Sequence, residues 1–298
     1  MRNFLDVTDL STDELGAVLD LAEAPSLPPV LHGQGVALIF EKPSNRTRQS
    51  MEMAVVQLAG HPVYTEGDHI GLDTREPVAD VARVMAGYHA VLAARVFRHD
   101  VLERMAAASS VPVVNLLSER SHPMQALADV LTMRQTVGPL ARRTVAWLGD
   151  YNNVARSLGE ASSMVGMHIR YGCPKGYGPD EAELERLRAL GAATIVAFHR
   201  PDEAVVGADA VHTDVWTSMG QEAEAAARKA AFDGWMVTDE IMAAAGRHAL
   251  FFHCMPVHRG EEVAESVMDG PRSRAIAQAH NRMHAARGLL AFLLGVRP

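Results

Sequence analysis

The sequence is poor in cysteine and aromatic residues and has no long hydrophobic run. Two cysteines, Cys173 and Cys254, among 298 residues exclude a disulfide framework and a four-cysteine zinc site. No apolar stretch in the chain approaches the roughly 18 to 20 residues that cross a bilayer. The N-terminal segment carries acidic residues where a signal peptide has an apolar stretch. We therefore expect a cytoplasmic, reduced protein without a membrane partner.

Positive charge is also scarce. The 28 lysines and arginines are outnumbered by 36 aspartates and glutamates, which gives a net charge of −8. This balance argues against a nucleic-acid partner. The chain contains neither a Walker A sequence nor GxGxxG, so no nucleotide site is expected. A hydrophobic content of 48% and a charged content of 21% are typical of a globular protein, here long enough for two domains.

Short apolar runs alternate with helical patterns along nearly the whole chain. Strands are expected at residues 36–40, 91–95 and 111–115, and within residues 144–150, 168–174, 193–198, 208–216 and 249–255. Helices are expected at residues 78–88, 101–108, 153–164, 179–190 and 273–294. A polar joint at residues 134–143 separates two such series. The pattern predicts an α/β protein with two domains, each a parallel sheet flanked by helices.

The segment GVALIFEKPSNRTRQS, which ends at Ser50, is the most informative part of the chain. A strand-like run is followed by hydroxyl and guanidinium groups at the point where helical spacing begins. The free N–H groups and the dipole of a helix start favour an anion, and arginine forks bind phosphate or carboxylate oxygens in pairs. A simple alternative is a serine N-cap followed by two solvated arginines. Further polar clusters favour the anion site.

Two such clusters follow strands in the first half. Arg95 closes one strand, and the next strand leads to SERSHPMQALADVLTM. His122 and Gln125 are three residues apart at a helix start, so they share one face. They can donate to a carbonyl oxygen and accept from an NH₂ group. Ligands of such folds bind outside the carboxyl ends of the strands, where these groups lie.

The second half offers a different chemistry, suited to a zwitterionic amino acid. Carboxylates and amides would bind its ammonium group, and hydroxyl and main-chain N–H groups its carboxylate. The residues concerned are Asn152 and Asn153 at a strand-to-helix turn, Asp214 with Ser218 and Met219, and His253 with Cys254. An asparagine at such a turn is also explained as an N-cap. Adjacent His and Cys leave a strand in opposite directions, so no metal is expected.

These motifs together resemble those of the ornithine carbamoyltransferases over essentially the whole chain. SNRTR resembles the STRTR turn for carbamoyl phosphate, and HPMQALAD resembles the HPxQ element. DVWTSMGQE and HCMPVHRGEEV resemble the ornithine-side signatures. The resemblance implies transfer of a carbamoyl group to the δ-amine of L-ornithine in arginine metabolism, giving L-citrulline and phosphate without a cofactor. It also implies homotrimers, or multiples of trimers, with active sites at subunit interfaces.

The resemblance also assigns domains and site residues. It implies a carbamoyl-phosphate domain at residues 1–135, completed by the C-terminal helix at 273–298, and an ornithine domain at 136–272. Carbamoyl phosphate would be bound by Ser44, Asn45, Arg46, Thr47, Arg95, His122, Gln125, Cys254, Met255 and Arg282. Ornithine would be bound by Asn153, Asp214, Ser218 and Met219. The catalytic contributions would come from Arg46, Arg95, His122, Asp214 and Cys254, with Arg48 supporting the turn.

Two positions depart from the family pattern. Asn45 stands where the family usually has threonine. Gly71 stands where a loop glutamine would reach the neighbouring subunit's phosphate, and either His69 or Arg75 replaces it or the contact is absent. Three alternatives stay open: an N-acylated ornithine as acceptor, putrescine as acceptor, and a binding paralogue that has lost turnover. Aspartate is disfavoured, because its second carboxylate would require further cationic groups.

The chemistry expected from the resemblance is direct attack by the amine. No Ser–His–Asp arrangement is recognisable, so no acyl-enzyme is expected. An aliphatic amine has a pKa of about 10.4, so holding it neutral near pH 7.4 costs on the order of 4 kcal/mol. Asp214, Cys254 or the phosphate itself could assist, and the sequence does not choose among them.

Overall fold

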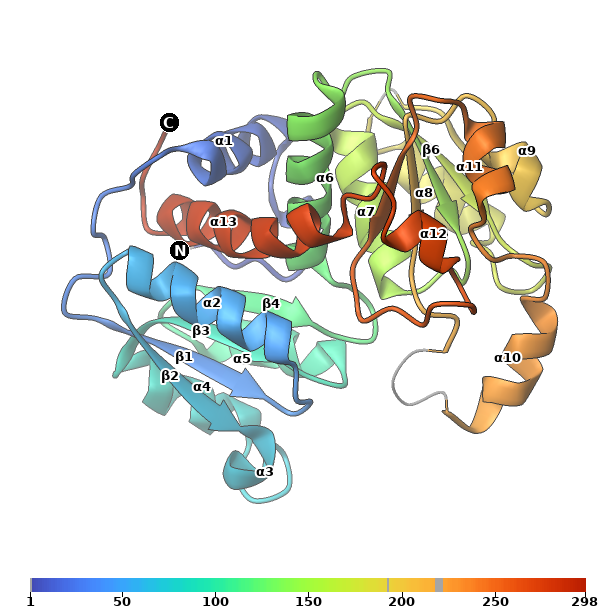
Figure 1. The fold of residues 1–298 in the computed structure, drawn as a ribbon. Helices are drawn as coiled ribbons and strands as arrows, with labels where there is room; N and C mark the ends of the chain where they lie inside the picture. The colour runs from blue at the N-terminus through green and yellow to red at the C-terminus, as the bar shows by residue number, and fades with distance from the viewer. Residues whose placement is uncertain (1, 192, 218–221) are drawn as a thin grey trace. The chain divides into compact units, whose positions relative to one another are not determined.

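The computed structural model describes residues 2–191, 193–217 and 222–298. Internal contacts divide the chain into two compact units. The first consists of Met1–Leu131 with His280–Pro298, and the second of Thr132–Ala279. Each unit is built around a parallel sheet with helices packed on it (Figure 1). The predicted two-domain α/β class is confirmed.

The sheet of the first unit has the strand order β2-β1-β3-β4. Its strands are β1 (Gly35–Phe40), β2 (His61–Glu66), β3 (His89–Arg95) and β4 (Val113–Leu117). All pair in parallel, and the central strands are almost entirely buried, as expected for apolar runs covered on both faces. The chain passes from β1 to β2 on one side and returns to β3 on the other. The carboxyl ends of β1 and β3 therefore flank the point where the strand order reverses, which is where such folds bind ligands.

Helices cover both faces of this sheet. They are η1 (Val7–Asp9), α1 (Thr12–Glu23), α2 (Asn45–Gln57), α3 (Gly67–Ile70), α4 (Val78–Ala86), α5 (His99–Ala108), α6 (Pro123–Val137) and α13 (Ala275–Leu293). On one face, α4 and α5 bury Val81 and Leu102 against Ile39 of β1. The last helix packs on α1: a Cβ at Gly288 would lie 2.6 Å from the backbone nitrogen of Ala22, so only glycine fits there. The predicted packing of the C-terminal helix on the first domain is confirmed.

The sheet of the second unit has the order β7-β6-β5-β8-β9. Its strands are β5 (Thr144–Leu148), β6 (His168–Gly172), β7 (Ile195–Phe198), β8 (Ala210–Thr213) and β9 (Leu250–His253). All of them pair in parallel. Here the strand order reverses between β5 and β8. The turns that follow these two strands are therefore the expected binding positions of this unit.

The second unit places aromatic residues on both faces of its sheet. Its helices are α7 (Asn153–Met164), α8 (Glu181–Arg188), α9 (Pro201–Val205), η2 (Glu222–Glu224), α10 (Ala225–Ala231), α11 (Asp239–Ala245) and α12 (Glu265–Met268). One face buries Phe232 and Trp235 in a cluster with Leu148 of β5. On the other face, the ring of His212 stacks on Trp147 with centroids 5.1 Å apart. The strands are thus fixed from both sides.

Several element boundaries differ from the sequence-based expectations. The strand β2 was not predicted, because HPVYTE lies at the sheet edge, is only partly buried and contains Pro62. The strand β4 begins at Val113, two residues after the expected start. The helix α6 continues to Val137, so the first part of the expected polar joint is helical.

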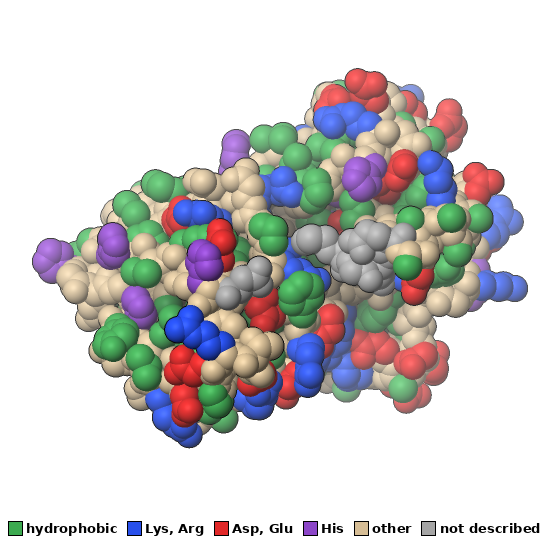
Figure 2. Space-filling model, turned by 90° about the horizontal axis from the view of Figure 1, so that it is seen from below, with side chains coloured by type: hydrophobic (Ala, Val, Ile, Leu, Met, Phe, Trp, Pro, Cys, Tyr) green, Lys and Arg blue, Asp and Glu red, His purple; other side chains and the backbone are tan. Residues whose placement is uncertain are grey.

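On the face shown in Figure 2, basic and acidic side chains of the described residues are interspersed. This distribution differs from the continuous basic stripe of a nucleic-acid interface. Among the described residues, none of the helices combines the length and the apolar character that crossing a membrane requires.

Candidate functional site

The turn between β1 and α2 is organised by two hydroxyl side chains. Ser44 is the N-cap of α2: its Oγ accepts a hydrogen bond from the Thr47 N–H at 3.4 Å and donates to Thr47 Oγ1 at 3.1 Å. The helix start therefore has the predicted serine cap, and its dipole still favours an anion. Arg48 donates to Glu52 at 2.8 Å and lies 3.7 Å from the ring centre of Tyr64, so it braces the helix.

Arg95 is a buried guanidinium with no carboxylate partner among the described residues. It is the last residue of β3, and only 5% of its surface is exposed. Its Nε has no hydrogen-bond partner, and no carboxylate of the described residues forms an ion pair with it. Burial, with the charges of Arg282 and Arg46, lowers the pKa of Arg95 to about 10. A buried charge of this kind is unfavourable until it is paired, so the site calls for an anion.

Arg282 of the last helix connects the elements around this charge. Its Nη2 donates to Thr47 Oγ1 at 2.8 Å. Its Nη1 donates to Gln125 Oε1 and lies 3.3 Å from His122 Nε2. These three acceptors are neutral groups, and together they orient the guanidinium of Arg282. Four residues predicted from separate parts of the chain thus lie in direct contact within the first unit.

His122 is a neutral hydrogen-bonding group in this arrangement. Burial, with the nearby charges of Arg282 and Arg95, holds the pKa of His122 well below its usual value of 6.5. Because Nε2 accepts from Arg282, the ring proton resides on Nδ1. Gln125 donates from Nε2 to Asp129 at 2.7 Å, which fixes its amide with Oε1 towards Arg282. The pair therefore offers an N–H donor and an amide oxygen with a second lone pair.

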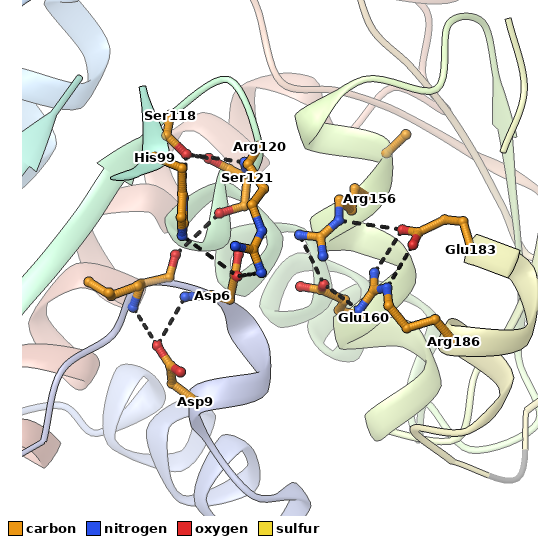
Figure 3. Close-up of polar contacts among 12 residues, drawn as sticks. Asp6, Asp9, His99, Ser118, Arg120, Ser121, Arg156, Glu160, Glu183 and Arg186 are labelled. Atoms are coloured by element: carbon orange, nitrogen blue, oxygen red, sulfur yellow. Dashed lines mark hydrogen bonds and ion pairs between the residues drawn. The ribbon is translucent and has the colours of Figure 1, made fainter. Parts of the chain in front are cut away.

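The loop that precedes His122 is supported from beneath by a polar network. His99 Nδ1 lies 2.8 Å from Ser118 Oγ, and Asn115 donates from Nδ2 to Ser121 Oγ at 3.0 Å. Figure 3 shows His99, Ser118 and Ser121 side by side in this network. Burial is the main cause that lowers the pKa of His99. This network ties the loop before α6 to α5 and β4.

The second unit has a carboxylate at its own strand-order reversal. Asp214 follows β8 and is 8% exposed. Its Oδ2 accepts from Asn152 Nδ2 at 2.8 Å, and its Oδ1 accepts from the Val215 N–H at 2.8 Å and from Cys254 Sγ at 3.0 Å. All three donors are neutral, so the negative charge of Asp214 stays uncompensated by these partners.

Two other buried carboxylates of this unit are paired with arginines. Asp150 forms an ion pair with Arg228 at 2.8 Å. Glu160, which has no exposed side-chain surface, lies 2.9 Å from Arg186, and Figure 3 shows this cluster. Asp214 differs from both, because its neighbours donate hydrogen bonds without supplying a positive charge. It therefore suits a cationic ligand group.

The side chain of Asn152 caps α7 and also donates a hydrogen bond to Asp214. Its side-chain oxygen caps α7, where it accepts from two main-chain N–H groups at 2.9 and 3.0 Å. Its NH₂ group holds Asp214. The GDYNN turn suggested the cap, but no sequence signal pointed to the contact with Asp214, 62 residues away in the chain. Asn153, the predicted ligand, is the first residue of α7.

The remaining predicted site residues lie in both units or outside the described part of the chain. Asn45 is exposed at the start of α2. Cys254 and Met255 follow β9 and belong to the second unit. Ser218 and Met219 lie outside the described residues. The ligand-binding roles of all these residues stay predictions.

The group formed by Asp214, His253 and Cys254 has its possible ligand atoms within 4.8 Å of one another. Both ring nitrogens of His253 already take part in hydrogen bonds. Nδ1 accepts from the Met255 N–H at 2.8 Å, and Nε2 lies 3.1 Å from Glu262 Oε1. A metal would have to break one of these bonds, so the residues present do not favour a metal site.

The loop expected to carry a glutamine has a compact local structure. Gly71 ends α3 in the left-handed region, with φ of 65°, which suits glycine. Arg75 donates from Nη1 to the carbonyl oxygen of His69 at 3.3 Å. The two candidate replacements for the glutamine are therefore linked to each other.

The fold and the two clusters define a class: a two-domain α/β protein with a buried group of arginines in one unit and a carboxylate held by neutral donors in the other. Models of a single family match both parts of the chain. The aspartate/ornithine carbamoyltransferase carbamoyl-P binding domain matches residues 2–135, and the Asp/Orn binding domain of the same family matches residues 141–293. The chain belongs to the aspartate/ornithine carbamoyltransferase family.

Individual relatives agree with this assignment. The chain is 46% identical to the ornithine carbamoyltransferase of Thermus thermophilus, over 98% of this chain and 97% of the relative. The solved structure of a Thermus thermophilus ornithine carbamoyltransferase matches with a TM-score of 0.89 and 44% identity, covering 98% of both chains. That of Pyrococcus furiosus matches with a TM-score of 0.94 and 38% identity, covering 99% of this chain and 98% of the other.

Proposed function

We propose that this protein is an ornithine carbamoyltransferase. It transfers the carbamoyl group of carbamoyl phosphate to the δ-amine of L-ornithine and releases L-citrulline and phosphate. The family assignment and the relatives at 41–46% identity support this activity. The single structural observation that carries it is the buried, uncompensated Arg95 beside Arg46 and Arg282.

Carbamoyl phosphate binds to the first unit, at residues 1–135 with the C-terminal helix. Arg46 and Arg95 contact the phosphate, and Ser44, Asn45 and Thr47 present the start of α2 to it. This assignment is supported by the helix start and by the missing counter-ion of Arg95. Binding of the dianion relieves the unfavourable burial of the guanidinium charge.

The carbonyl oxygen of the substrate is the place where charge develops during the transfer. His122, neutral with its proton on Nδ1, donates to this oxygen, and Arg282 lies beside it. Gln125 accepts from the carbamoyl NH₂ group through the second lone pair of its oxygen. Fixed donors of this kind stabilise a tetrahedral intermediate without reorganisation during the reaction.

Ornithine binds to the second unit, at residues 136–272. Asp214 pairs with its α-ammonium group, with Asn153 nearby, and Ser218 and the Met219 main chain bind its carboxylate. Cys254 and the Met255 main chain act near the reacting amine. The neutral partners of Asp214 support its part in this assignment, because they leave its charge for a ligand.

The nucleophile is the neutral δ-amine, which attacks the carbonyl carbon directly. Its proton passes to Asp214, to Cys254 or to a phosphate oxygen as the C–N bond forms and the C–O bond to phosphate breaks. An amine with a pKa of about 10.4 is mostly protonated at neutral pH, so it must also lose a first proton before the attack, and this earlier loss contributes to the barrier.

The assembly and the location belong to the same proposal. A homotrimer, or a multiple of trimers, is inferred from the resemblance to the family. A cytoplasmic location is supported by two cysteines that are buried and not joined in a disulfide, as in proteins of a reducing compartment. The place in arginine metabolism follows from the reaction.

Product formation with a set of amines tests the proposed function. Purified protein with carbamoyl phosphate should form citrulline from L-ornithine, and turn over putrescine, N-acetylornithine and L-aspartate far more slowly. Faster turnover of N-acetylornithine or putrescine than of L-ornithine would show that this other amine is the acceptor. If a single-turnover experiment at high carbamoyl phosphate gave no product with any amine, the protein would be a binding paralogue and the proposed activity would be wrong.

A further inference from the structure

A buried carboxylate holds the loop that follows β9. Neither Glu262 nor His253 has exposed side-chain surface, and His253 Nε2 lies 3.1 Å from Glu262 Oε1. The same oxygen accepts from the His258 N–H at 2.6 Å. Oxygen Oε1 thereby connects the end of the strand to the middle of the loop 254–262.

The other ring nitrogen of His253 holds the main chain beside the predicted site. Nδ1 accepts from the Met255 N–H at 2.8 Å. Because this nitrogen accepts, the ring proton resides on Nε2, from which it is donated to Glu262. An acceptor at the position of Glu262 Oε1 therefore selects the tautomer that binds Met255.

The restrained segment has an unusual backbone and contains a site residue. Met255 has φ of 59°, a region uncommon for residues other than glycine. Cys254 lies between His253 and Met255, and its Sγ donates to Asp214 Oδ1 at 3.0 Å. A change in the hydrogen bond between His253 and Met255 would therefore displace the thiol beside Asp214.

The strand end itself is fixed independently of this pair. The His253 N–H donates to Gln278 Oε1 at 2.9 Å, and Gln278 Nε2 lies 2.9 Å from His212 Nε2. The backbone of His253 thus stays in place when its side chain changes. This separation allows the role of the ring to be tested by substitution.

We propose that Glu262 and His253 are positioning residues for the amine side of the reaction. Glu262 sets the tautomer of His253, and His253 holds the Met255 N–H, which keeps Cys254 and Met255 in place for the δ-amine. Neither residue touches the substrate. The inference rests on the proposed function; it adds Glu262, to which the sequence gave no role, and makes His253 a positioning residue rather than a ligand.

Two substitutions of Glu262 separate its hydrogen bonding from its charge. In Glu262→Gln the amide oxygen can keep both hydrogen bonds of Oε1, and Oε2, which has no hydrogen bond, becomes NH₂. Glu262→Met has a similar shape without an acceptor. The expected kcat/KM for ornithine falls by about 10- to 100-fold in Glu262→Met and stays within about threefold in Glu262→Gln, since small misplacements of reacting groups carry large rate penalties. The KM for carbamoyl phosphate should be unchanged in both.

Glu261→Gln is the matched control, because Glu261 is the neighbouring carboxylate and is partly exposed. It should leave kcat/KM unchanged. Equal kcat/KM in Glu262→Met and in the wild type would overturn the proposal.

Substitutions of His253 test separately the hydrogen bonds made by its two ring nitrogens. They also provide a test of the proposal if Glu262→Met does not fold. The oxygen of His253→Asn can replace Nδ1 as the acceptor for Met255, whereas the amide of His253→Gln can replace Nε2 towards Glu262. The proposal predicts a higher kcat/KM for ornithine in His253→Asn than in His253→Gln, at similar thermal stability. Equal values or the reverse order would overturn it.

A readout without turnover distinguishes this inference from the proposed function. The rate of alkylation of Cys254 by iodoacetamide, measured by mass spectrometry against Cys173, should change by at least about fivefold in Glu262→Met, because thiol reactivity depends on local environment and access. It should stay unchanged in Glu262→Gln and Glu261→Gln. An unchanged rate in Glu262→Met would overturn the positioning role. Absence of citrulline from the wild type would contradict the proposed function alone.

Discussion

The two units carry sites of opposite charge that are built in the same way. In the first unit, Arg282 is held by a hydroxyl, an imidazole and an amide oxygen, all of them neutral. In the second unit, Asp214 is held by an amide, a main-chain N–H and a thiol, which are neutral as well. Each site lies where the strand order of its parallel sheet reverses.

In the second unit, the donors to Asp214 orient its charge without neutralising it, and in the first unit the buried Arg95 has no carboxylate partner among the described residues. Elsewhere in the second unit, Asp150 and Glu160 face arginines, and their charges are paired within the protein. A charge that is fixed by neutral partners keeps its electrostatic attraction for a ligand of opposite sign. We therefore expect that each site can be disabled separately.

Replacing the uncompensated cation should have the largest effect. In Arg95→Gln, kcat/KM for carbamoyl phosphate should fall by about 10² to 10³, the usual effect of losing one charge-stabilising donor. The free energy of unfolding without ligand should rise by on the order of 1 kcal/mol, because an unpaired buried charge is removed. Steady-state kinetics and chemical denaturation measure the two effects. Retained activity with a lower stability would show that Arg95 is structural.

Replacing the carboxylate should affect the other substrate. Asp214→Asn keeps the shape and removes the charge, so kcat/KM for ornithine should fall by about 10², as for loss of a charged hydrogen bond worth about 3 kcal/mol. Thermal stabilisation by carbamoyl phosphate should be unchanged. A loss of carbamoyl phosphate binding in this variant would contradict the division between the units.

The pH dependence of kcat/KM for ornithine should reflect deprotonation of the δ-amine and not of His122. The δ-amine, with a pKa of about 10.4, loses its proton progressively above pH 7, so kcat/KM for ornithine should rise up to about tenfold per pH unit. The pKa of His122 is far below 6.5, so its protonation should not shape this range. A profile that is flat between about pH 6.5 and 8.5 would contradict rate-relevant deprotonation of the amine.

The smallest effect is expected for His99, whose hydrogen-bond network supports the loop before His122, and it concerns the pH dependence of stability. Burial lowers the pKa of His99 below 6.5, so the unfolded chain binds its proton more readily than the folded one. The free energy of unfolding should therefore decrease as the pH falls from 6.5 through the lowered pKa. The charges that face His99 are those of Asp6, Glu103, Glu119 and Arg120.

Denaturation in His99→Gln checks this dependence. The variant should lose part of the decrease in stability at acidic pH, whereas the control His32→Gln, at an exposed position, should keep it. An identical pH dependence in the wild type and in His99→Gln would contradict the role of His99 burial.

The sequence predicted the elements whose local pattern is strong. The strand expected at residues 36–40 is β1 (Gly35–Phe40), and the helical spacing after Ser44 corresponds to α2. The edge strand β2 was missed, because half-buried strands lack a continuous apolar run. A hydrophobic pattern in the sequence reflects how deeply a strand is buried, and a strand at the sheet edge is less buried than a central one.

Contacts between distant parts of the chain could not be predicted in the same way. The motifs named Arg282, but only the fold shows that it donates to Thr47, 235 residues away. The contact of Asn152 with Asp214 and that of His253 with Glu262 were not anticipated, because cap and loop residues have ordinary local explanations.

A crystal structure with a bisubstrate analogue, in which a phosphonate is joined to ornithine, would locate both halves of the ligand at once. We expect the phosphonate oxygens to bind Arg46 and Arg95 and the α-ammonium group to bind Asp214. A phosphonate bound away from Arg95, or an ammonium group paired with a different carboxylate, would contradict this assignment.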